Sequence, residues 1–382
     1  MDIIKKAAKL PWHLVRLLLL GFFFFSGIVA IVFNQFLYIT WAAIVRNGTD
    51  SDSDGVLQQR LEHTKKAFIV LLTFCTNNFS SKSEVMLSFR DAELMKKCVK
   101  AKEFGALPEL SFDPSAIIMS NHQIYSDWFF LWYLAYLNNI SQHFFIVMKK
   151  SLLRLPILGQ GMRNYSFVFL SRNWEQDKEY MNQQFAHIKT LNRKFWMLIF
   201  PEGTNISHNN KKISHKYAEK VHLPKNECVL LPRVKGLYVA AKQLYPNTTK
   251  ILDFSIGYSD HGKDDMAQDV FTLWRIYIEG VSPKRISILV DEHDLQKQVP
   301  GLYNEEFDEE TQMDCLGQWI NGVWVVKEKD MEHYYEKGEF DVPEGNSLVF
   351  PLELKSNWEV IGVYGPTLAI TVAVLALILL WK

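Results

Sequence analysis

The chain of 382 residues has no net charge, because 42 Lys and Arg residues balance 42 Asp and Glu residues. A nucleic-acid-binding protein would show a basic excess or a basic stripe, so this balance argues against that class. Only four cysteines are present, at positions 75, 98, 228 and 315, and they form no CxxC pair and no Cys/His zinc spacing. The sequence therefore predicts reduced thiols in ordinary packing.

Two common catalytic motifs are also missing. No Gly-x-Ser-x-Gly sequence is present to form a nucleophile elbow, so no motif points to an acyl-enzyme. No His-Glu-x-x-His sequence and no Cys/His cluster predicts a metal site. The chain also has no internal repeat, and no low-complexity tract outside two apolar runs. We expect chemistry that needs neither a metal nor a bound cofactor.

Long apolar runs stand at both ends of the chain. From Leu17 to Val45 there are 29 residues without a charge, and from Val360 to Trp381 there are 22 more. About 20 such residues span the hydrocarbon core of a bilayer. The first run exceeds the core of a secretory signal, and no small-x-small cleavage site closes it. We therefore predict an N-terminal membrane segment over residues 1–46 and a C-terminal transmembrane helix over 360–381.

The side of the membrane that holds the middle of the chain depends on the first run. Four basic residues between Lys5 and Arg16 precede it, so the positive-inside rule places the N-terminus in the cytosol. A single crossing would leave the middle in the lumen, where five Asn-x-Ser/Thr sequons could carry glycans. However, polar residues and glycines between Gly21 and Gln35 interrupt the run. A hairpin of two half-depth helices would return the chain to the cytosolic side, which we favour.

Between these ends, short apolar runs alternate with helical patterns, which is typical of α/β folds. The pattern predicts a mixed sheet flanked by helices, in a catalytic domain over residues 60–335. The expected strands are 116–119, 143–148, 166–170, 195–200, 251–258 and 271–279, and the expected helices are 127–137, 175–192, 234–244 and 309–329. A short apolar run over 67–75 predicts a buried or interfacial helix. Residues 336–358, with Pro343 and Pro351, are expected to form a linker.

The most informative stretch runs from Asn121 to Asp127. It places His122 five positions before Asp127, just past an expected strand. An imidazole with a carboxylate to orient it is a general base near neutral pH, because free His titrates at about 6.5. One such spacing among 11 histidines is roughly an even-odds accident, so the pair needs the support of other motifs.

Three further motifs stand near expected strands. Phe200-Pro201-Glu202-Gly203-Thr204 follows one strand directly, at the edge where α/β sheets place ligands. Its glycine allows close approach of the backbone, and its threonine supplies a hydroxyl. Phe169-Leu170-Ser171-Arg172 ends another strand with a guanidinium suited to phosphate. Leu230-Leu231-Pro232-Arg233 leads into an expected helix. Each of these also fits a plain turn or strand end when taken singly.

In their order and spacing, the four motifs resemble those of the glycerophospholipid acyltransferase superfamily, over about residues 110 to 245. The run from Phe200 to Ser207 and the Leu-Pro-Arg motif look most similar to the lysocardiolipin and lysophosphatidylinositol acyltransferase branch. Fungal members of that branch also carry a C-terminal apolar tail. Two positions differ from the family pattern. Ser166 stands where the second motif usually opens with Gly, and Asn205 stands where many members have a phosphate-binding Arg.

The resemblance implies a role for each matching residue. His122 would be the general base and Asp127 its orienting partner. The substrate-binding residues would be Asn121, Arg172, Glu202, Gly203 and Thr204, with Pro232 shaping the acyl-CoA site. The implied reaction is direct transfer of an acyl group from acyl-CoA to the free hydroxyl of a lysophospholipid, with a lysophosphatidylinositol-type acceptor favoured.

Two alternatives remain open. Lysophosphatidic acid could be the acceptor instead, although Asn205 argues against it. From a different class, the chain could be a non-catalytic, membrane-anchored lipid-binding protein. In either case the expected partner is the bilayer, in the endoplasmic reticulum and also on lipid droplets.

Two groups of side chains have ambiguous roles. Aromatic residues follow Asp127 closely and could line an acyl groove or form a core helix; they are Trp128, Phe129, Phe130, Trp132, Tyr133 and Tyr136. Four lysines could meet the phosphates of CoA or form a solvated helix face; they are Lys211, Lys212, Lys216 and Lys220.

Overall fold

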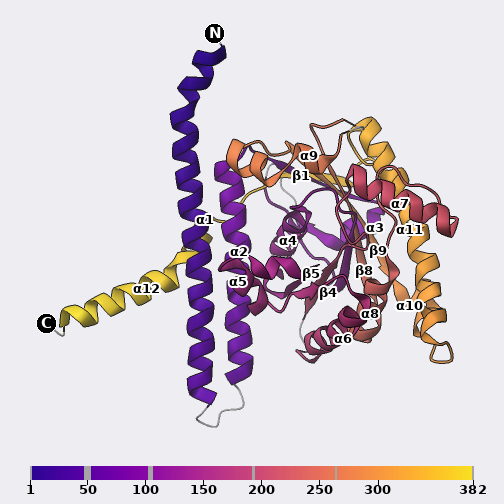
Figure 1. Cartoon of the computed structure of the whole chain (residues 1–382), viewed down its shortest axis with the longest axis horizontal. Coiled ribbons are helices and arrows are strands. Elements are labelled where there is room, and N and C mark those ends of the chain that lie inside the picture. Colours follow the sequence, from indigo (N-terminus) through magenta and orange to yellow (C-terminus); the bar gives the residue numbers. More distant parts are fainter. Residues whose placement is uncertain (1, 47–52, 102–105, 192–193, 263–264, 381–382) are drawn as a thin grey trace.

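The computed structural model describes residues 2–46, 53–101, 106–191, 194–262 and 265–380. A sheet of eight strands in the order β10-β1-β9-β8-β4-β7-β5-β6 lies at its centre, with helices around it (Figure 1). Its strands are β1 (Glu84–Phe89), β4 (Ser115–Ser120), β5 (Phe144–Lys149), β6 (Val168–Leu170), β7 (Phe195–Ile199), β8 (Lys250–Tyr258), β9 (Arg285–Asp294) and β10 (Ser347–Pro351). A small second sheet pairs β2 (Val99–Ala101) with β3 (Glu109–Leu110). The predicted mixed sheet flanked by helices is confirmed.

Five neighbouring strands, β6, β5, β7, β4 and β8, run parallel to one another. The sheet continues through an antiparallel β8/β9 pair, a parallel β9/β1 pair and an antiparallel β1/β10 pair. Parallel strands have their carboxyl ends at the same edge of a sheet, which is where α/β folds bind ligands. Three of the four predicted motifs follow β4, β6 and β7, so the topology brings them to one edge.

The two faces of the sheet are covered by different helices. Ala116 and Ile118 of β4 belong to one hydrophobic core, and Ile117 and Met119 belong to the other, as the alternation of side chains along a strand requires. The first core is closed by α2 (Ser53–Phe79) and α4 (Asp127–Leu137). The second is closed by α6 (Trp174–Thr190), α8 (Val234–Leu244) and α11 (Glu309–Lys337). Burial of both faces explains why β4 is an unbroken apolar run.

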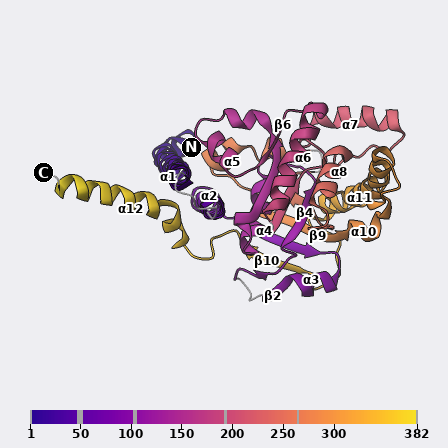
Figure 2. The ribbon, with the colours of Figure 1, turned by 90° about the horizontal axis from the view of Figure 1, so that it is seen from below.

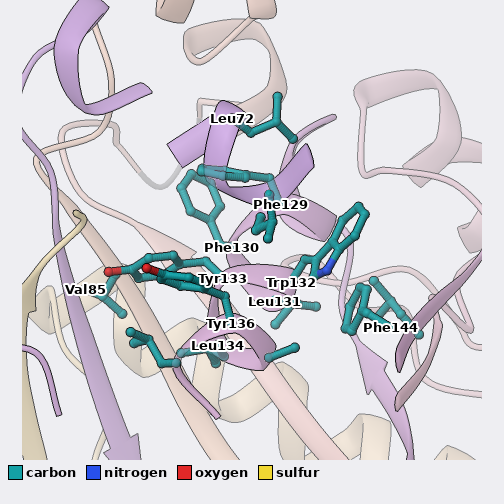
Figure 3. Close-up of a cluster of buried hydrophobic side chains, with 14 of the residues drawn as sticks. Leu72, Val85, Phe129, Phe130, Leu131, Trp132, Tyr133, Leu134, Tyr136 and Phe144 are labelled. Atoms are coloured by element: carbon teal, nitrogen blue, oxygen red, sulfur yellow. The ribbon is translucent and has the colours of Figure 1, made fainter. Parts of the chain in front are cut away.

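The aromatic residues after Asp127 form a core helix. Figure 3 shows their rings on α4 packed together, with Leu72 of α2 and Phe144 of β5 nearby. Trp132 is fully buried, stacks on Phe144 at a centroid distance of 5.5 Å, and donates its indole N–H to the Ser141 carbonyl at 2.8 Å. Tyr133 is equally buried and donates to the Glu353 carbonyl at 2.7 Å. Because these rings fill the core, the arrangement favours packing over an acyl groove.

The N-terminal apolar run is one continuous helix, α1 (Asp2–Arg46), so the expected hairpin of two half-depth helices is wrong. The polar residues that suggested a break are used in packing. Gln35 is fully buried, donates to the Thr64 hydroxyl of α2 at 3.1 Å, and accepts from Asn164 of α5 (Leu158–Asn164) at 2.9 Å. The predicted helix over 67–75 is confirmed as a buried part of α2, where Ile69 is fully buried.

The segment expected as a strand over 271–279 is helical instead. Residues Trp274–Glu279 form a π-helix that ends at Gly280, whose φ of +75° is a left-handed conformation that glycine adopts without strain. Its carbonyl end is capped by the Arg16 guanidinium of α1, which donates to Ile278. The Tyr277 hydroxyl lies 3.1 Å from that of Thr76 on α2. Docking against α1 and α2 therefore overrides the alternating pattern.

The stretch 336–358 is only partly a linker. Helix α11 continues to Lys337, beyond its expected end at 329, and Gly338 ends it with a φ of +79°. Strand β10 then pairs with β1 at the edge of the sheet, so this stretch belongs to the catalytic domain. Beyond it, α12 (Glu359–Leu380) is helical, as expected, and contains Pro366.

Most other expectations hold within a few residues. The helices predicted over 127–137 and 234–244 match α4 and α8 at both ends. The remaining short helices are α3 (Ala92–Cys98), α7 (His208–Val221), α9 (Ala267–Val270), α10 (Leu295–Gln298) and three 3₁₀ turns at Ser141–His143, Lys150–Arg154 and Pro300–Tyr303. Position 192, where helix 175–192 was expected to end, lies outside the described residues.

Candidate active site

The structure brings His122 and Asp127 together at the carboxyl edge of the sheet. The imidazole Nδ1 lies 2.8 Å from Asp127 Oδ2. Asp127 is fully buried, whereas the His122 side chain keeps 18% of its surface exposed. The imidazole ring stacks on Phe200 at a centroid distance of 4.2 Å. This arrangement fixes the ring and leaves Nε2 without a hydrogen-bond partner among the described residues.

The chain between the two residues holds the Asp127 carboxylate in place. The backbone N–H of Gln123 donates to Oδ2 at 2.6 Å, and that of Ile124 donates to the same oxygen at 3.1 Å. Asp127 is also the first residue of α4, where the helix dipole favours a negative charge. The spacing of five positions therefore has a local cause, because the loop folds back over the carboxylate that begins the next helix.

Tyr258, at the end of β8, completes the set of donors. Its hydroxyl donates to Asp127 Oδ1, on the side of the carboxylate away from the imidazole. Tyr258 is 1% exposed, and both burial and the Asp127 charge raise the pKa of its hydroxyl well above the usual range. The hydroxyl therefore stays protonated and keeps donating. Sequence reasoning missed this residue because it lies 131 positions from Asp127, outside the four motifs.

The change Tyr258→Phe should lower kcat by about 3- to 30-fold, which is part of what a hydrogen bond to a charged group contributes. The freed carboxylate should also hold the imidazolium more strongly, so the acid limb of the pH–rate profile should move to higher pH. Tyr238→Phe is the matched control, because Tyr238 is a buried tyrosine that donates to Gln312 Oε1 at 3.0 Å. A loss of stability in both variants, with kcat and pH profile unchanged, would show that Tyr258 is only structural.

The third and fourth motifs meet beside this pair. The backbone N–H of Arg233 donates to the Pro201 carbonyl at 2.7 Å, and that of Gly203 donates to Phe200 at 2.9 Å, closing a turn. Gly203 has a φ of +71°, and a Cβ there would lie 3.4 Å from Arg233 Cδ. The exposed Arg233 guanidinium therefore lies against the Gly203 turn. Arg233 was not among the predicted site residues, although the Leu-Pro-Arg motif contained it.

Glu202 lies next to the pair but under the surface. It is 1% exposed, and neither carboxyl oxygen completes a hydrogen bond among the described residues. Burial raises the pKa of Glu202 well above its usual range, and the nearby Leu230 amide and Lys327 ammonium only partly offset this. A neutral carboxyl group can donate a hydrogen bond. Its predicted contact with substrate stays a prediction.

Two other predicted substrate-binding residues are buried. Asn121 is fully buried; its side chain donates to the Ile256 carbonyl at 3.0 Å and accepts from the Ile256 N–H at 2.8 Å. This pairing favours a structural role, in which Asn121 joins the ends of β4 and β8. Pro232 is buried just before α8 begins at Val234, where its ring fixes the entry to the helix.

Arg172 stands at the same edge of the sheet, after β6, with its side chain exposed. Its φ of +71° is unusual for a residue with a Cβ. The buried Asp177 carboxylate of α6 holds this conformation by accepting from the N–H groups of Ser171 and Arg172, each at 2.8 Å. Positive φ outliers of this kind occur at functional sites. The strand order puts Arg172 three strands from His122.

Thr204 and Asn205 connect the third motif to α7. The Thr204 hydroxyl accepts from the Asn210 side chain at 3.2 Å and remains partly exposed. Asn205 is 8% exposed, and its side chain donates to Gln268. The residue that replaces the family's arginine is thus used in packing. The nearest cation to this turn shown by the structure is the one at Arg233.

Comparison with known proteins agrees with this geometry. A sequence model of the acyltransferase family matches residues 98–259. The chain is 32% identical to the 2-acyl-1-lysophosphatidylinositol acyltransferase of Saccharomyces cerevisiae, over 85% of this chain and 86% of that protein. It is 31% identical to an uncharacterised acyltransferase of the same yeast, over 85% of this chain and 81% of that protein. It is also 29% identical to lysocardiolipin acyltransferase 1 of Gallus gallus, over 65% of this chain and 61% of that protein.

Proposed function

Since the chain belongs to the acyltransferase family, we propose that it transfers an acyl group from acyl-CoA to the free hydroxyl of a lysophospholipid. The observation that carries this proposal is the His122–Asp127 pair, which leaves one imidazole nitrogen open at the ligand-binding edge of the sheet. Because the yeast relative that matches over most of its length is named for 2-acyl-1-lysophosphatidylinositol, a lysophosphatidylinositol-type acceptor is favoured. Such a reaction would remodel the acyl chains of phospholipids.

The proposed mechanism begins with the imidazole in one tautomer. Because Asp127 accepts from Nδ1, that nitrogen carries the hydrogen and Nε2 is free to act as the base. As the lysolipid oxygen attacks the thioester carbonyl carbon, its proton passes to Nε2. The C–S bond then breaks, the departing sulfur takes the proton from Nε2, and the products are the ester and free CoA. Asp127 stabilises the imidazolium between these steps.

Arg233 is the proposed partner of the acceptor's phosphate. The turn at Gly203 follows β7, which lies directly beside the strand that carries His122. In a lysophospholipid only a few bonds separate the phosphate from the free hydroxyl, so both must bind close together. An exposed guanidinium at this turn meets that requirement and compensates for the missing arginine at position 205.

The proposed membrane arrangement follows from two contacts of α1. Arg16 donates to the Phe79 carbonyl at 2.6 Å, and Gln35 accepts from Asn164 at 2.9 Å. These positions are about 28 Å apart along the helix, close to the thickness of the hydrocarbon core. A helix that crossed the bilayer could not touch the same water-exposed domain at both ends of that span. We therefore propose that α1 lies along the membrane surface.

The exposed face of α1 suits this orientation. Large apolar side chains recur along it; Leu18, Phe22, Phe25, Val29, Phe33 and Phe36 are each at least 39% exposed. Helix α12 starts beside α1, where the Tyr364 hydroxyl donates to the Phe23 carbonyl at 2.6 Å. It then points away from the sheet on the side of α1 (Figures 1 and 2). Its length of about 33 Å is enough to cross the bilayer.

This arrangement would keep the domain on the cytosolic face of the endoplasmic reticulum and place the C-terminus in the lumen. An added glycosylation sequon after Lys382 should then receive a glycan in microsomes, while Asn78 and Asn247 stay unmodified. A glycan at Asn247 would place the domain in the lumen.

The proposed activity is tested with a matrix of lysolipids and acyl-CoA donors on membranes that contain the protein. We expect transfer to lysophosphatidylinositol to exceed transfer to lysophosphatidic acid, lysocardiolipin and lysophosphatidylcholine. Transfer mainly to lysophosphatidic acid would make the protein an enzyme of phosphatidic acid synthesis. Lysolipid binding without any transfer would instead identify a non-catalytic lipid-binding protein.

A further inference from the structure

A strongly basic pocket lies at the same edge of the sheet as His122, on the far side of β5. It has a volume of about 490 Å³ and is lined by Lys149, Lys150, Arg154 and Arg163, with Ser151 and Ser171 between them. No Asp or Glu lines it. All four cations are exposed, and none of them forms an ion pair within the described part of the chain. Such a pocket suits a ligand that carries several negative charges.

Local folding builds this pocket. Lys150 and Arg154 lie on a 3₁₀ turn, and Arg163 lies on α5, which follows it. The two elements press together at Gly159, where a Cβ would lie only 2.4 Å from the Leu153 carbonyl oxygen. The chain between them passes through Ile157 at a φ of +63°, a strained conformation for a β-branched residue. The close packing is what sets Arg163 beside Arg154.

The strand registers give the distance from the reaction centre. Ile199 of β7 is level with Met119 of β4, and Leu198 is level with Ile146 of β5, so Lys149 and His122 stand at nearly the same height. The pocket begins two strands from β4 and reaches β6, three strands away. At about 4.8 Å per strand, it is roughly 10–14 Å from His122.

This distance separates the two substrates. The phosphate of a lysophospholipid is too close to its reacting hydroxyl to reach the pocket while that hydroxyl is at His122. In acyl-CoA, the phosphates are separated from the thioester by the pantetheine arm. That arm has a backbone about as long as four extended residues, or roughly 14 Å. Resting on the proposed function, we propose that this pocket binds the phosphate groups at the nucleotide end of the acyl-CoA donor.

The lysines of α7 fit this role less well. Lys211 is paired with Glu227 at 2.5 Å, and Lys212, Lys216 and Lys220 are exposed on a helix face that lines no described pocket. A solvated face is the better interpretation for them.

The test uses the purified full-length protein in detergent, with CoA and 3′-dephospho-CoA as probes. Arg154→Gln/Arg163→Gln should raise the Kd for CoA by about 10- to 100-fold, because each lost guanidinium–phosphate pair contributes about tenfold. The loss should be smaller for 3′-dephospho-CoA, and Arg154→Lys/Arg163→Lys should recover part of the affinity. Lys297→Gln/Lys329→Gln removes the same charge from exposed positions outside the pocket and should bind CoA normally. In the transfer assay, the Gln variant should raise KM for acyl-CoA and leave KM for the lysolipid within about twofold.

Several results would overturn the proposal. CoA binding equal to that of the control variant would show that the pocket does not hold the phosphates. A rise in KM for the lysolipid alone would assign the pocket to the acceptor, and a loss of binding to anionic vesicles alone would assign it to the lipid surface. Because CoA binding is measured without an acyl group, a protein that binds CoA through this pocket but transfers nothing would contradict only the proposed reaction.

Discussion

Replacing His122 with alanine is expected to reduce acyl transfer by about 10²- to 10⁴-fold, the usual contribution of general-base catalysis. The variant loses the only nitrogen at this edge that the structure shows both oriented by a buried carboxylate and open to a ligand, among the described residues. The measurement is kcat/KM for transfer from acyl-CoA in membranes that contain equal amounts of wild-type and variant protein.

His187→Ala is the matched control, because His187 is exposed in the last turn of α6. It should retain wild-type activity. Substantial transfer by the His122 variant would remove the proposed base from the mechanism, whatever the acceptor.

Asp127→Asn should be nearly as damaging, with an expected loss of about 10³- to 10⁴-fold in kcat. The asparagine side chain would fit the space, but one of its two groups is a donor. The site offers it three donors, the Gln123 and Ile124 N–H groups and the Tyr258 hydroxyl, in addition to the imidazole. A donor placed among donors favours the wrong imidazole tautomer and also costs about 1–3 kcal/mol of stability.

The control for this variant is Asp308→Asn. Asp308 caps α11 by accepting from the Thr311 N–H at 2.8 Å, so it tests the loss of a similar local interaction away from the site. Only a small loss of stability and full activity are expected there. If Asp127→Asn kept the wild-type kcat, the carboxylate would be a structural cap of α4 and nothing more.

Sequence patterns predicted the parts of the fold in which local and tertiary requirements agree. Helix α4 begins at Asp127 and α8 follows Pro232, and both have strong local start signals. Strand β4 is apolar throughout because both of its faces are covered. Patterns failed where distant contacts decide. The alternation over 271–279 gave way to docking on α1 and α2, and β10 pairs with β1 more than 250 positions away.

The candidate site was predicted in outline. His122 and Asp127 were found because their spacing is local, and Gly203 because a close turn requires a left-handed residue. Tyr258 and the basic pocket were missed because only the strand order brings them near the motifs. Asn121 was assigned to substrate from its neighbours, whereas its amide is used in pairing with Ile256.

The most direct test of the account is the pH dependence of acyl transfer to lysophosphatidylinositol, measured from about pH 5 to 9 with purified wild-type and His122→Ala proteins. The wild-type rate should rise with pH as a single base loses its proton and then reach a plateau. The variant should be slow throughout and lack that rise. A variant that keeps both the rise and the rate would show that the proton is taken up by a different group.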